Sequence, residues 1–470
     1  MKKQKKGISL IVLIITIVVI IILATAVILI MTNNNPIENA RKAVFQNDLQ
    51  AIQEKVNTYY QSKYVESEGE YESESFTGDS MVAKFPNTEK YKDKIEIIKG
   101  EVILTNKATE EEILWAEEIG ILAINKWDGS IDTAWYYDNP GANSFEIYTA
   151  SELAGLAEIV NKNIDSFQGK TINLKEDIDL NNIEWTPIGV DIDDSNVFFR
   201  GKFDGEKHIV SNMKITEKKG KDIPSALFGC IWQISGYNDE VYVKNIIVKD
   251  SRIVGKDAGC IVGSLWNDNH SNDLCYVENC ASINNYIEGS YSAGGVVNNL
   301  LDAKVINCYN TSDIVCTYNS IVNISSTDGM AGGIEAGCID EGKIINCYNT
   351  GDITAYGCYA GGIVGGCSIY TIFNCYNVGN ITGMENYTGE IIGYAQGSEI
   401  RNCYYLNGKI DIGTKDVFDP SYGEICETIA ITESDLKLED AINKLNRNGY
   451  SEYKQDTDNI NSGYPILNWQ

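Results

Sequence analysis

The stretch AGGIVGGCSIYTIFNCYNVGNIT at residues 360–382 holds two short patterns that recur along the chain. Its Asn-Cys pair occurs five times, at successive intervals of 28, 39, 28 and 28 residues. A glycine signature, Ala-Gly-Gly-apolar, recurs in step with it at 293–297 and 331–334. A fixed period of about 20–50 residues is typical of stacked supersecondary units. The repeated pairs are Asn279-Cys280, Asn307-Cys308, Asn346-Cys347, Asn374-Cys375 and Asn402-Cys403.

Each repeat consists of apolar runs of four to six residues that are broken by Gly and Asn, which is typical of short strands joined by turns. Stacked as coils, such strands pair with their copies above and below, and their inward side chains form one continuous core. Asn at a fixed turn can hydrogen-bond the same Asn one coil away, and Cys is small enough to stack inside a narrow coil. We expected the Gly pairs to supply the positive φ of a tight corner. The prediction is a mainly β chain with a parallel β-solenoid over 166–413.

A tyrosine follows the repeated Cys at four positions. Neighbouring residues in a strand point to opposite faces, so an inward Cys implies an outward Tyr. One interpretation is an aromatic stripe that stacks on sugars or fills a protein interface. The other is that a loop or the C-terminal segment covers the stripe. The four residues are Tyr309, Tyr348, Tyr376 and Tyr404.

The repeats resemble the GLUG-motif proteins, which combine a Gly-Gly-apolar-Val-Gly element with an Asn-Cys-Tyr-Asn-x-Gly-x-Ile unit. GGIVG at 361–365 followed by NCYNVGNI at 374–381 carries the resemblance. WTPIG at 185–189, FRGKFDGEKHI at 199–209 and GYPIL at 463–467 are similar to the opening coils and ending of that family. The resemblance covers roughly residues 140–470. It implies a β-helical bacterial surface or adhesin-like protein without a catalytic residue set.

The N-terminus holds an apolar segment that is long enough to span a membrane. Residues 8–31 are 24 positions without a charge, and as a helix they measure about 36 Å against a hydrocarbon core of about 30 Å. Four lysines precede them and place the N-terminus in the cytoplasm. We therefore expect a single-pass protein of the cell membrane with an extracellular ectodomain.

The leader KKGISLI at 5–11 resembles that of type IV pilins and pseudopilins. The resemblance implies cleavage by a prepilin peptidase after Gly7, methylation of Ile8, and contact with other pilin subunits. That family usually carries Glu at the fifth mature position, where this chain has Val12, so filament assembly stays open. The alternative is a plain uncleaved signal anchor. Apolar residues at helical spacing extend the predicted helix to residue 64.

The remaining patterns divide the chain into parts. Residues 95–98 and 102–104 predict a hairpin, Thr109 is a candidate N-cap, and residues 148–161 predict an amphipathic helix. The predicted parts are a basic leader (1–7), a transmembrane, pilin-like helix (8–64), a small α+β head (65–126), a helical N-terminal cap (127–165), the solenoid (166–413) and a C-terminal cap (414–470).

Composition limits the chemistry. With 66 acidic and 38 basic residues the formal net charge is −28, which argues against nucleic-acid binding. Only two histidines are present, so a His-based metal site or triad is not expected, and we predict no metal and no cofactor. Thirteen cysteines at largely repeated positions favour packed thiols over disulfides. The pair Cys275 and Cys280 is the best candidate for a bridge.

Acidic side chains offer two further interpretations. The loops at 191–194 and 267–273 have oxygen ligands for Ca²⁺ but no known calcium pattern, so solvated loops are favoured. Asp204, Asp250 and Asp352 are candidate catalytic carboxylates, but Asp204 and Asp352 lie inside repeat or opening motifs, where forming a turn is the simpler role. We therefore expected no enzyme.

The sequence favours a pilin-like surface adhesin whose solenoid binds a glycan or a host or matrix protein. The alternatives are an envelope-tethered polysaccharide-active enzyme and a secretion-system pseudopilin with a structural solenoid.

Overall fold

The computed structural model divides into two compact units, residues 1–124 and 125–470. The leader, Gly7, Ile8, the apolar segment 8–31, the acidic loop at 191–194 and most of the loop at 267–273 lie outside the described residues. Within the described residues, no helix combines the length and apolarity that a membrane crossing requires. The described ranges are 36–66, 75–98, 100–105, 107–121, 127–190, 197–216, 223–268, 274–319, 329–338, 341–384, 387–408, 414–416, 425–447 and 449–470.

The first unit is a long helix packed on a small α+β head. Helix α2 buries Phe45, Leu49, Ile52 and Val56, at spacings of three or four residues, against an antiparallel hairpin. The side chain of Gln53 joins the two, because its Oε1 accepts from Val102 N at 2.7 Å. The hairpin is confirmed, and so is the part of the predicted helix 8–64 that the structure describes, from residue 36 onward. The elements are α2 (Pro36–Glu66), α3 (Gly78–Lys84), η1 (Pro86–Tyr91), β1 (Ile95–Ile98), β2 (Glu101–Leu104) and α4 (Glu110–Glu117).

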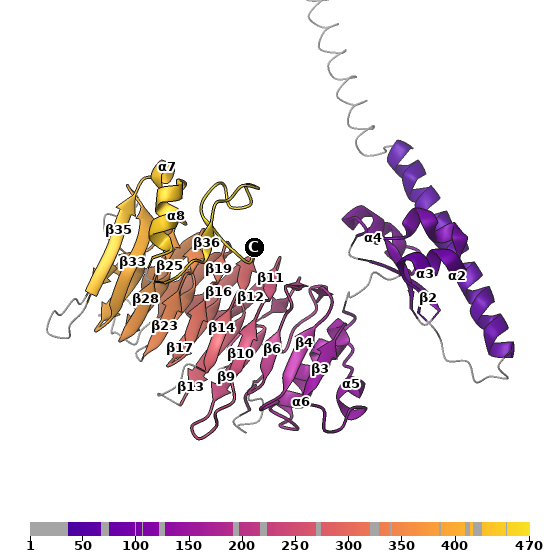
Figure 1. The fold of residues 1–470 in the computed structure, drawn as a ribbon, viewed down its shortest axis with the longest axis horizontal. Coiled ribbons are helices and arrows are strands. Elements are labelled where there is room, and N and C mark those ends of the chain that lie inside the picture. The colour runs from indigo at the N-terminus through magenta and orange to yellow at the C-terminus, as the bar shows by residue number, and fades with distance from the viewer. Residues whose placement is uncertain are drawn as a thin grey trace, which may run out of the picture. The chain divides into compact units, whose positions relative to one another are not determined.

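The second unit begins with a helical segment that packs on the first coils. Helix α6 (Ala150–Asn161) is capped by Thr149, whose side chain accepts from Glu152 N, and its apolar residues join the solenoid core. This agrees with the helix predicted at 148–161. The short helix α5 (Ala134–Tyr137) and strand β3 (Ser144–Ile147) precede it. Figure 1 shows α5 and α6 at the magenta end of the stacked strands.

The predicted parallel β-solenoid is confirmed, and it has three parallel sheets whose strands follow one another around each coil (Figure 1). The sheet with β3 also holds β4 (Thr171–Leu174), β5 (Ile178–Asp179), β6 (Lys202–Asp204), β7 (Ile209–Ser211), β10 (Val241–Lys244), β11 (Ile247–Lys249), β14 (Cys275–Glu278), β15 (Ala281–Ile283), β18 (Lys304–Ile306), β19 (Tyr309–Asn310), β23 (Gly342–Ile345), β24 (Tyr348–Asn349), β28 (Tyr370–Phe373), β29 (Tyr376–Asn377), β33 (Glu399–Leu406) and β35 (Ile425–Ile431).

The two smaller sheets complete the coil. One holds β8 (Lys214–Ile215), β12 (Arg252–Gly259), β16 (Tyr286–Gly294), β20 (Asp313–Asn319), β21 (Met330–Gly332), β25 (Ile353–Gly357), β26 (Tyr359–Gly361), β30 (Ile381–Thr382) and β31 (Thr388–Gly389). The other holds β9 (Phe228–Gln233), β13 (Val262–Asn267), β17 (Val297–Leu301), β22 (Glu335–Cys338), β27 (Val364–Ser368), β32 (Ile392–Gln396) and β34 (Thr414–Asp416).

The chain ends in a segment, residues 432–470, that leaves the coils. It contains α7 (Glu433–Leu436), α8 (Glu439–Leu445) and the antiparallel pair β36 (Tyr453–Lys454) and β37 (Ile466–Leu467). We call residues 432–470 the C-terminal segment. Figure 1 shows its helices and β36 in yellow beside the strands of the coils.

Equivalent residues of successive coils stack directly on one another. Ile344 pairs in register with Ile372 of the next coil, and Ile372 pairs with Ile400. All three are at most 1% exposed. Because the same apolar positions repeat in every coil, the interior is one continuous core along the whole solenoid.

The corners of the coils are made by asparagine, not by glycine as we expected. The repeated Asn residues have φ between 52° and 56°, the left-handed region that Asn tolerates better than most residues. The paired glycines do not have positive φ, and they are required for another reason. A Cβ on Gly295 or Gly333 would lie 2.0 Å from a glycine carbonyl oxygen of the next coil, so only glycine allows the coils to approach this closely. The expectation was therefore wrong about which residue turns the chain.

The carboxyl group of Glu335 lies in the interior of the coils. Glu335 stands in register between Val297 and Val364 and is fully buried. Its Oε1 lies 3.5 Å from the Tyr370 hydroxyl, and its Oε2 has no hydrogen-bond partner. Burial raises the pKa of Glu335 well above its usual value. The folded protein therefore keeps this carboxyl protonated at a pH where the unfolded chain releases the proton.

Replacing Glu335 with Val should stabilise the protein increasingly as the pH rises. Below the unfolded pKa of about 4.3 both states hold the proton, whereas above it the unfolded state gains free energy by ionising. Removing a poorly satisfied buried carboxyl is expected to contribute about 1–3 kcal/mol at pH 7. Urea unfolding of wild type and variant at pH 4 and pH 7.5 measures this, and an equal difference at both values would contradict it.

Candidate binding sites

The repeated asparagines form a hydrogen-bonded ladder along one corner of the solenoid. The Nδ2 of Asn374 donates to Asn346 Oδ1 at 3.1 Å, and the Nδ2 of Asn402 donates to Asn374 Oδ1 at 2.8 Å. Asn346 donates to Asn307 at 3.0 Å, and Asn279 extends the row to Asn245 at the same distance. The repeated asparagines therefore stabilise the corner of the solenoid by hydrogen bonds between coils.

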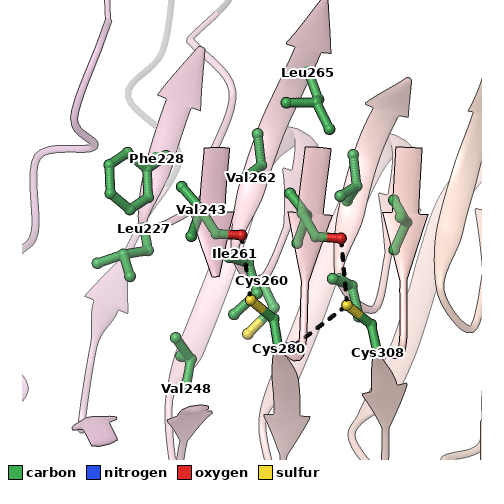
Figure 2. Close-up of a cluster of buried hydrophobic side chains, with 14 of the residues drawn as sticks. Leu227, Phe228, Val243, Val248, Cys260, Ile261, Val262, Leu265, Cys280 and Cys308 are labelled. Atoms are coloured by element: carbon green, nitrogen blue, oxygen red, sulfur yellow. Dashed lines mark hydrogen bonds between the residues drawn. The ribbon is translucent and has the colours of Figure 1, made fainter. Parts of the chain in front are cut away.

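The repeated cysteines lie next to the asparagines and point into the core. Figure 2 shows Cys280 and Cys308 side by side among buried apolar side chains. The Cys308 sulfur accepts a hydrogen bond from Cys280 N at 3.4 Å. In the same way, the Cys347 sulfur accepts from Cys308 N, and the Cys375 sulfur accepts from Cys347 N. Each thiol is therefore a packing group and a weak acceptor for the coil below it.

No disulfide is present among the twelve cysteines whose side chains the structure describes. Cys275 and Cys280, which we considered as a bridge, are both free and buried. Burial raises the pKa of Cys260 and Cys275 to about 12, so these thiols stay protonated and unreactive at neutral pH. These cysteines are therefore packed thiols and not disulfide partners.

The four tyrosines do not form a ligand surface, and this corrects the interpretation of an exposed stripe. They point out of the coil, as the alternation required, but the C-terminal segment covers them. Their exposed fractions are 6% for Tyr309, 1% for Tyr348, 0% for Tyr376 and 2% for Tyr404. The rings of Tyr309, Tyr348 and Tyr376 stack nearly parallel, with centroids 5.0 and 4.9 Å apart.

Hydrogen bonds fasten the C-terminal segment to this tyrosine row. The Tyr376 hydroxyl donates to Pro465 O and accepts from Asn461 Nδ2 at 2.9 Å. The Tyr453 hydroxyl reaches into the coil corner and donates to Asn374 O at 2.9 Å. Trp469 donates through Nε1 to Asn307 O at 2.8 Å. The row is therefore an internal docking surface for the chain's own C-terminal segment.

The three aspartates that we weighed as catalytic carboxylates have turn-forming partners. Asp204 accepts from Asn245 Nδ2 at 2.9 Å, and Asp352 accepts from the backbone and side chain of Asn380 at 3.0 and 2.9 Å. Asp250 accepts from Asn284 Nδ2 at 2.6 Å. Each carboxylate thus bonds an Asn of the following coil, and the structure does not bring the three together in one site.

A groove with two tryptophans lies at the N-terminal end of the solenoid. Its volume is about 580 Å³, and α6 forms one wall through Ala157, Glu158 and Lys162. Trp127 and Trp185 line it with their ring centroids 5.6 Å apart. Both indole N–H groups are used internally, Trp127 bonding Ser130 O at 2.7 Å and Trp185 bonding Leu227 O at 3.2 Å. The rings are thereby held in place at the base of the groove, where Trp127 is 7% and Trp185 is 1% exposed.

A crossing of the chain over α6 forms the other wall. Asp132 N donates to Ser151 O at 2.9 Å, and a Cβ on Gly155 would lie 1.8 Å from Asp132 O. Only glycine at position 155 lets the segment pass this close to the helix. The crossing brings the exposed side chain of Ile131 to the groove.

The sequence analysis did not single out this groove. Trp185 was noted only as part of an opening coil, and Trp127 lies at a predicted boundary between parts. The available signal was that both tryptophans fall outside the regular repeats.

The architecture defines residues 125–470 as a parallel β-solenoid with a helical N-terminal segment and a C-terminal segment that folds back on its outer face. One solved structure similar to the chain is described as a "putative immunoglobulin A1 protease" from Bacteroides ovatus, with 19% identity, a TM-score of 0.48, and coverage of 70% of this chain and 93% of that one. Another is described as an IgA1 protease, with 14% identity and a TM-score of 0.40 over 59% of this chain, and the match spans only 21% of that chain. No family model matches the chain, and no curated protein matches it.

These comparisons contradict our expectation that the chain is not an enzyme, because both structures carry the name of a protease. We withdraw that expectation. Both names describe those proteins, and likenesses with TM-scores of 0.48 and 0.40 assign no reaction to this chain.

Proposed function

We propose that this protein is held at the cell surface by its N-terminal segment and that its solenoid binds glycans through the groove of Trp127 and Trp185. The observation that carries the proposal is that groove. The tyrosine row, which was the sequence-based candidate for such a surface, is covered by the chain itself. The groove therefore becomes the candidate site for a ligand from outside the chain.

The size and lining of the groove suit a short stretch of polysaccharide. Small-molecule pockets usually measure about 300–1,000 Å³, and this groove measures about 580 Å³. Both tryptophan rings form the packed floor of the groove, so the side chain of Ile131, which is 54% exposed, supplies the apolar contact for the C–H face of a sugar. Glu158 and Lys162, which form an ion pair on the rim, offer an acceptor and a donor for sugar hydroxyls.

The surface location rests on the N-terminal sequence. Residues 8–31 are long enough to cross a bilayer, and KKGISLI at 5–11 resembles a prepilin leader. We propose cleavage after Gly7, methylation of Ile8, and a single crossing with residues 36–470 outside the cell. N-terminal sequencing of the native protein tests this, since a methylated Ile8 supports prepilin processing and an intact Met1 rejects it.

Glycan binding can be tested with the full-length protein in detergent and an array of bacterial and host glycans. Ile131→Glu places a charge on the groove wall at a side chain that is 54% exposed, so the fold should persist while binding weakens about tenfold or more. Ile460→Glu is the matched control, because Ile460 is 59% exposed in the C-terminal segment.

Two results would overturn the groove proposal, namely no bound glycan, or equal binding by Ile131→Glu and wild type. The same samples are analysed for shortened glycan products. Shortened products would assign a polysaccharide-active enzyme instead of a binding protein.

A further inference from the structure

A second, polar pocket lies on the other side of the last turn of α6. It measures about 310 Å³. Val160 and Asn163 contribute to it, whereas the neighbouring Asn161 and Lys162 contribute to the tryptophan groove. Neighbouring residues at the end of α6 therefore line two different pockets. The remaining lining residues are Ile164, Asp165, Ser166, Phe198 and Arg200.

Arg200 is the cation of this pocket and lacks a carboxylate partner. Within the described part of the chain its guanidinium forms no salt bridge, and its buried Nε has no hydrogen-bond partner. Partial burial lowers the pKa of Arg200, although an arginine stays charged at any physiological pH. Arg200 is therefore a partly buried cation whose guanidinium has no acid partner among the described residues, in a chain with a formal net charge of −28.

Aromatic rings hold the guanidinium in place. The Cζ of Arg200 lies 5.8 Å from the Phe198 ring centre and 5.9 Å from that of Trp232. The Phe198 and Trp232 rings meet edge to face at 4.6 Å. The indole N–H of Trp232 is also buried without a partner among the described residues. Arg200 Nε and the Trp232 indole N–H are thus both unpartnered donors, although Trp232 itself does not line the pocket.

Asp165, the acidic residue of the pocket, already has partners for its carboxylate within the chain. Burial by itself would raise the pKa of Asp165, but hydrogen bonds from Lys170, Phe167 N and Tyr136 lower it below its usual value. Asp165 is therefore a charged, internally bonded residue that leaves Arg200 free for another anion.

We propose that this pocket binds the carboxylate of an acidic sugar residue, with Arg200 as its partner. The proposal rests on the glycan-binding function proposed above and specifies the chemical class of the glycan. A guanidinium forms two parallel hydrogen bonds with a carboxylate, and a volume of about 310 Å³ accommodates roughly one sugar ring. A glycan chain in the tryptophan groove would reach this pocket across the end of α6.

The experiment compares charged sugars with neutral counterparts on the full-length protein in detergent. The pairs are trigalacturonate with its methyl ester and sialyllactose with lactose. We expect the wild type to bind at least one acidic sugar about tenfold more tightly than its neutral counterpart, because only the acidic sugar forms charge-assisted hydrogen bonds with Arg200. Arg200→Gln should abolish that preference, and Trp fluorescence should report binding through Trp232.

Two further variants complete the design. Ile164→Asp adds a repelling charge at a pocket side chain that is 46% exposed, so it tests the pocket even where Arg200→Gln fails to fold. Arg252→Gln is the matched control, because Arg252 also lies on an aromatic ring, 4.5 Å from the centre of Tyr286, but pairs with Glu288. Its affinity should equal that of the wild type.

The outcomes separate this proposal from the more general one. Acidic and neutral sugars bound equally, or an unchanged preference in both Arg200→Gln and Ile164→Asp, would overturn the acidic-sugar site and leave glycan binding intact. A wild type that binds none of the four sugars and no glycan on the array would overturn both proposals.

Discussion

Replacing Tyr376 with alanine is expected to destabilise the protein by about 3–5 kcal/mol, the usual cost of truncating a fully buried aromatic residue. Tyr376 is 0% exposed, and its ring stacks on Tyr348 with the centroids 4.9 Å apart. The truncation removes that stack and also leaves Asn461 and Pro465 O without their hydroxyl partner. The C-terminal segment should separate from the coils at a lower urea concentration than in the wild type.

Urea unfolding followed by tryptophan fluorescence measures this change, because Trp469 packs on the tyrosine row at 5.5 Å from Tyr309. Tyr376→Phe keeps the ring and should cost only about 1–2 kcal/mol, which is the share of the hydroxyl bonds. Tyr356→Ala is the control, since Tyr356 is 61% exposed and should change stability by less than about 0.5 kcal/mol. Equal midpoints for Tyr376→Ala and Tyr356→Ala would show that the segment does not depend on the tyrosine row.

Asn374→Ala is expected to cost about 2–5 kcal/mol through two separate effects. Asn374 is fully buried, and its side-chain amide forms hydrogen bonds with Asn346 and Asn402 in the coils on either side. Losing both bonds leaves two partners unsatisfied, at about 1–3 kcal/mol. Its φ of 54° adds about 1–2 kcal/mol for alanine, which adopts this conformation with strain.

Asn374→Gly separates the two effects, because glycine adopts positive φ without strain but cannot make the ladder bonds. We expect it to be more stable than Asn374→Ala by about 1 kcal/mol and less stable than the wild type. Asn182→Ala is the matched control, since Asn182 has φ of 54° at an exposed position and should show only the strain. If Asn374→Ala and Asn182→Ala cost the same in urea unfolding, the ladder contributes nothing.

Both predictions reflect how stability is distributed in a stacked fold. Each coil contacts mainly its neighbours, so a defect in one rung weakens two interfaces and leaves the others in place. The tyrosine row differs because one segment spans several coils. Tyr453 alone reaches the carbonyl oxygens of Cys347 and Asn374, which belong to successive coils. The C-terminal segment therefore acts as a brace along the solenoid as well as a cover.

The stacked coils and their corner residues could be read from the amino-acid pattern because every coil repeats the same local requirements. The interval of 28 residues between Asn346 and Asn374 is one circuit of the coil, so an in-register ladder follows directly from the repeat. The alternation of Cys and Tyr also predicted correctly which side chain points inward. The role of the paired glycines could not be read in this way. Glycine can be required either for a positive φ or for a close approach of two backbones. Only the distance between the coils shows which of the two requirements holds at a given glycine.

The tertiary structure decided what lies on the outside of the coils. Whether Tyr376 is a ligand surface or an internal contact depends on Asn461, which lies 85 positions along the chain, and no repeat records that contact. The tryptophan groove likewise depends on the passage of Asp132 over Gly155. Arg200 is left without an acid partner because Lys170 forms the ion pair with Asp165. Repetition in the sequence encodes the contacts that recur from coil to coil. Contacts made only once, between distant segments, leave no period in the sequence and appear only when the chain is folded.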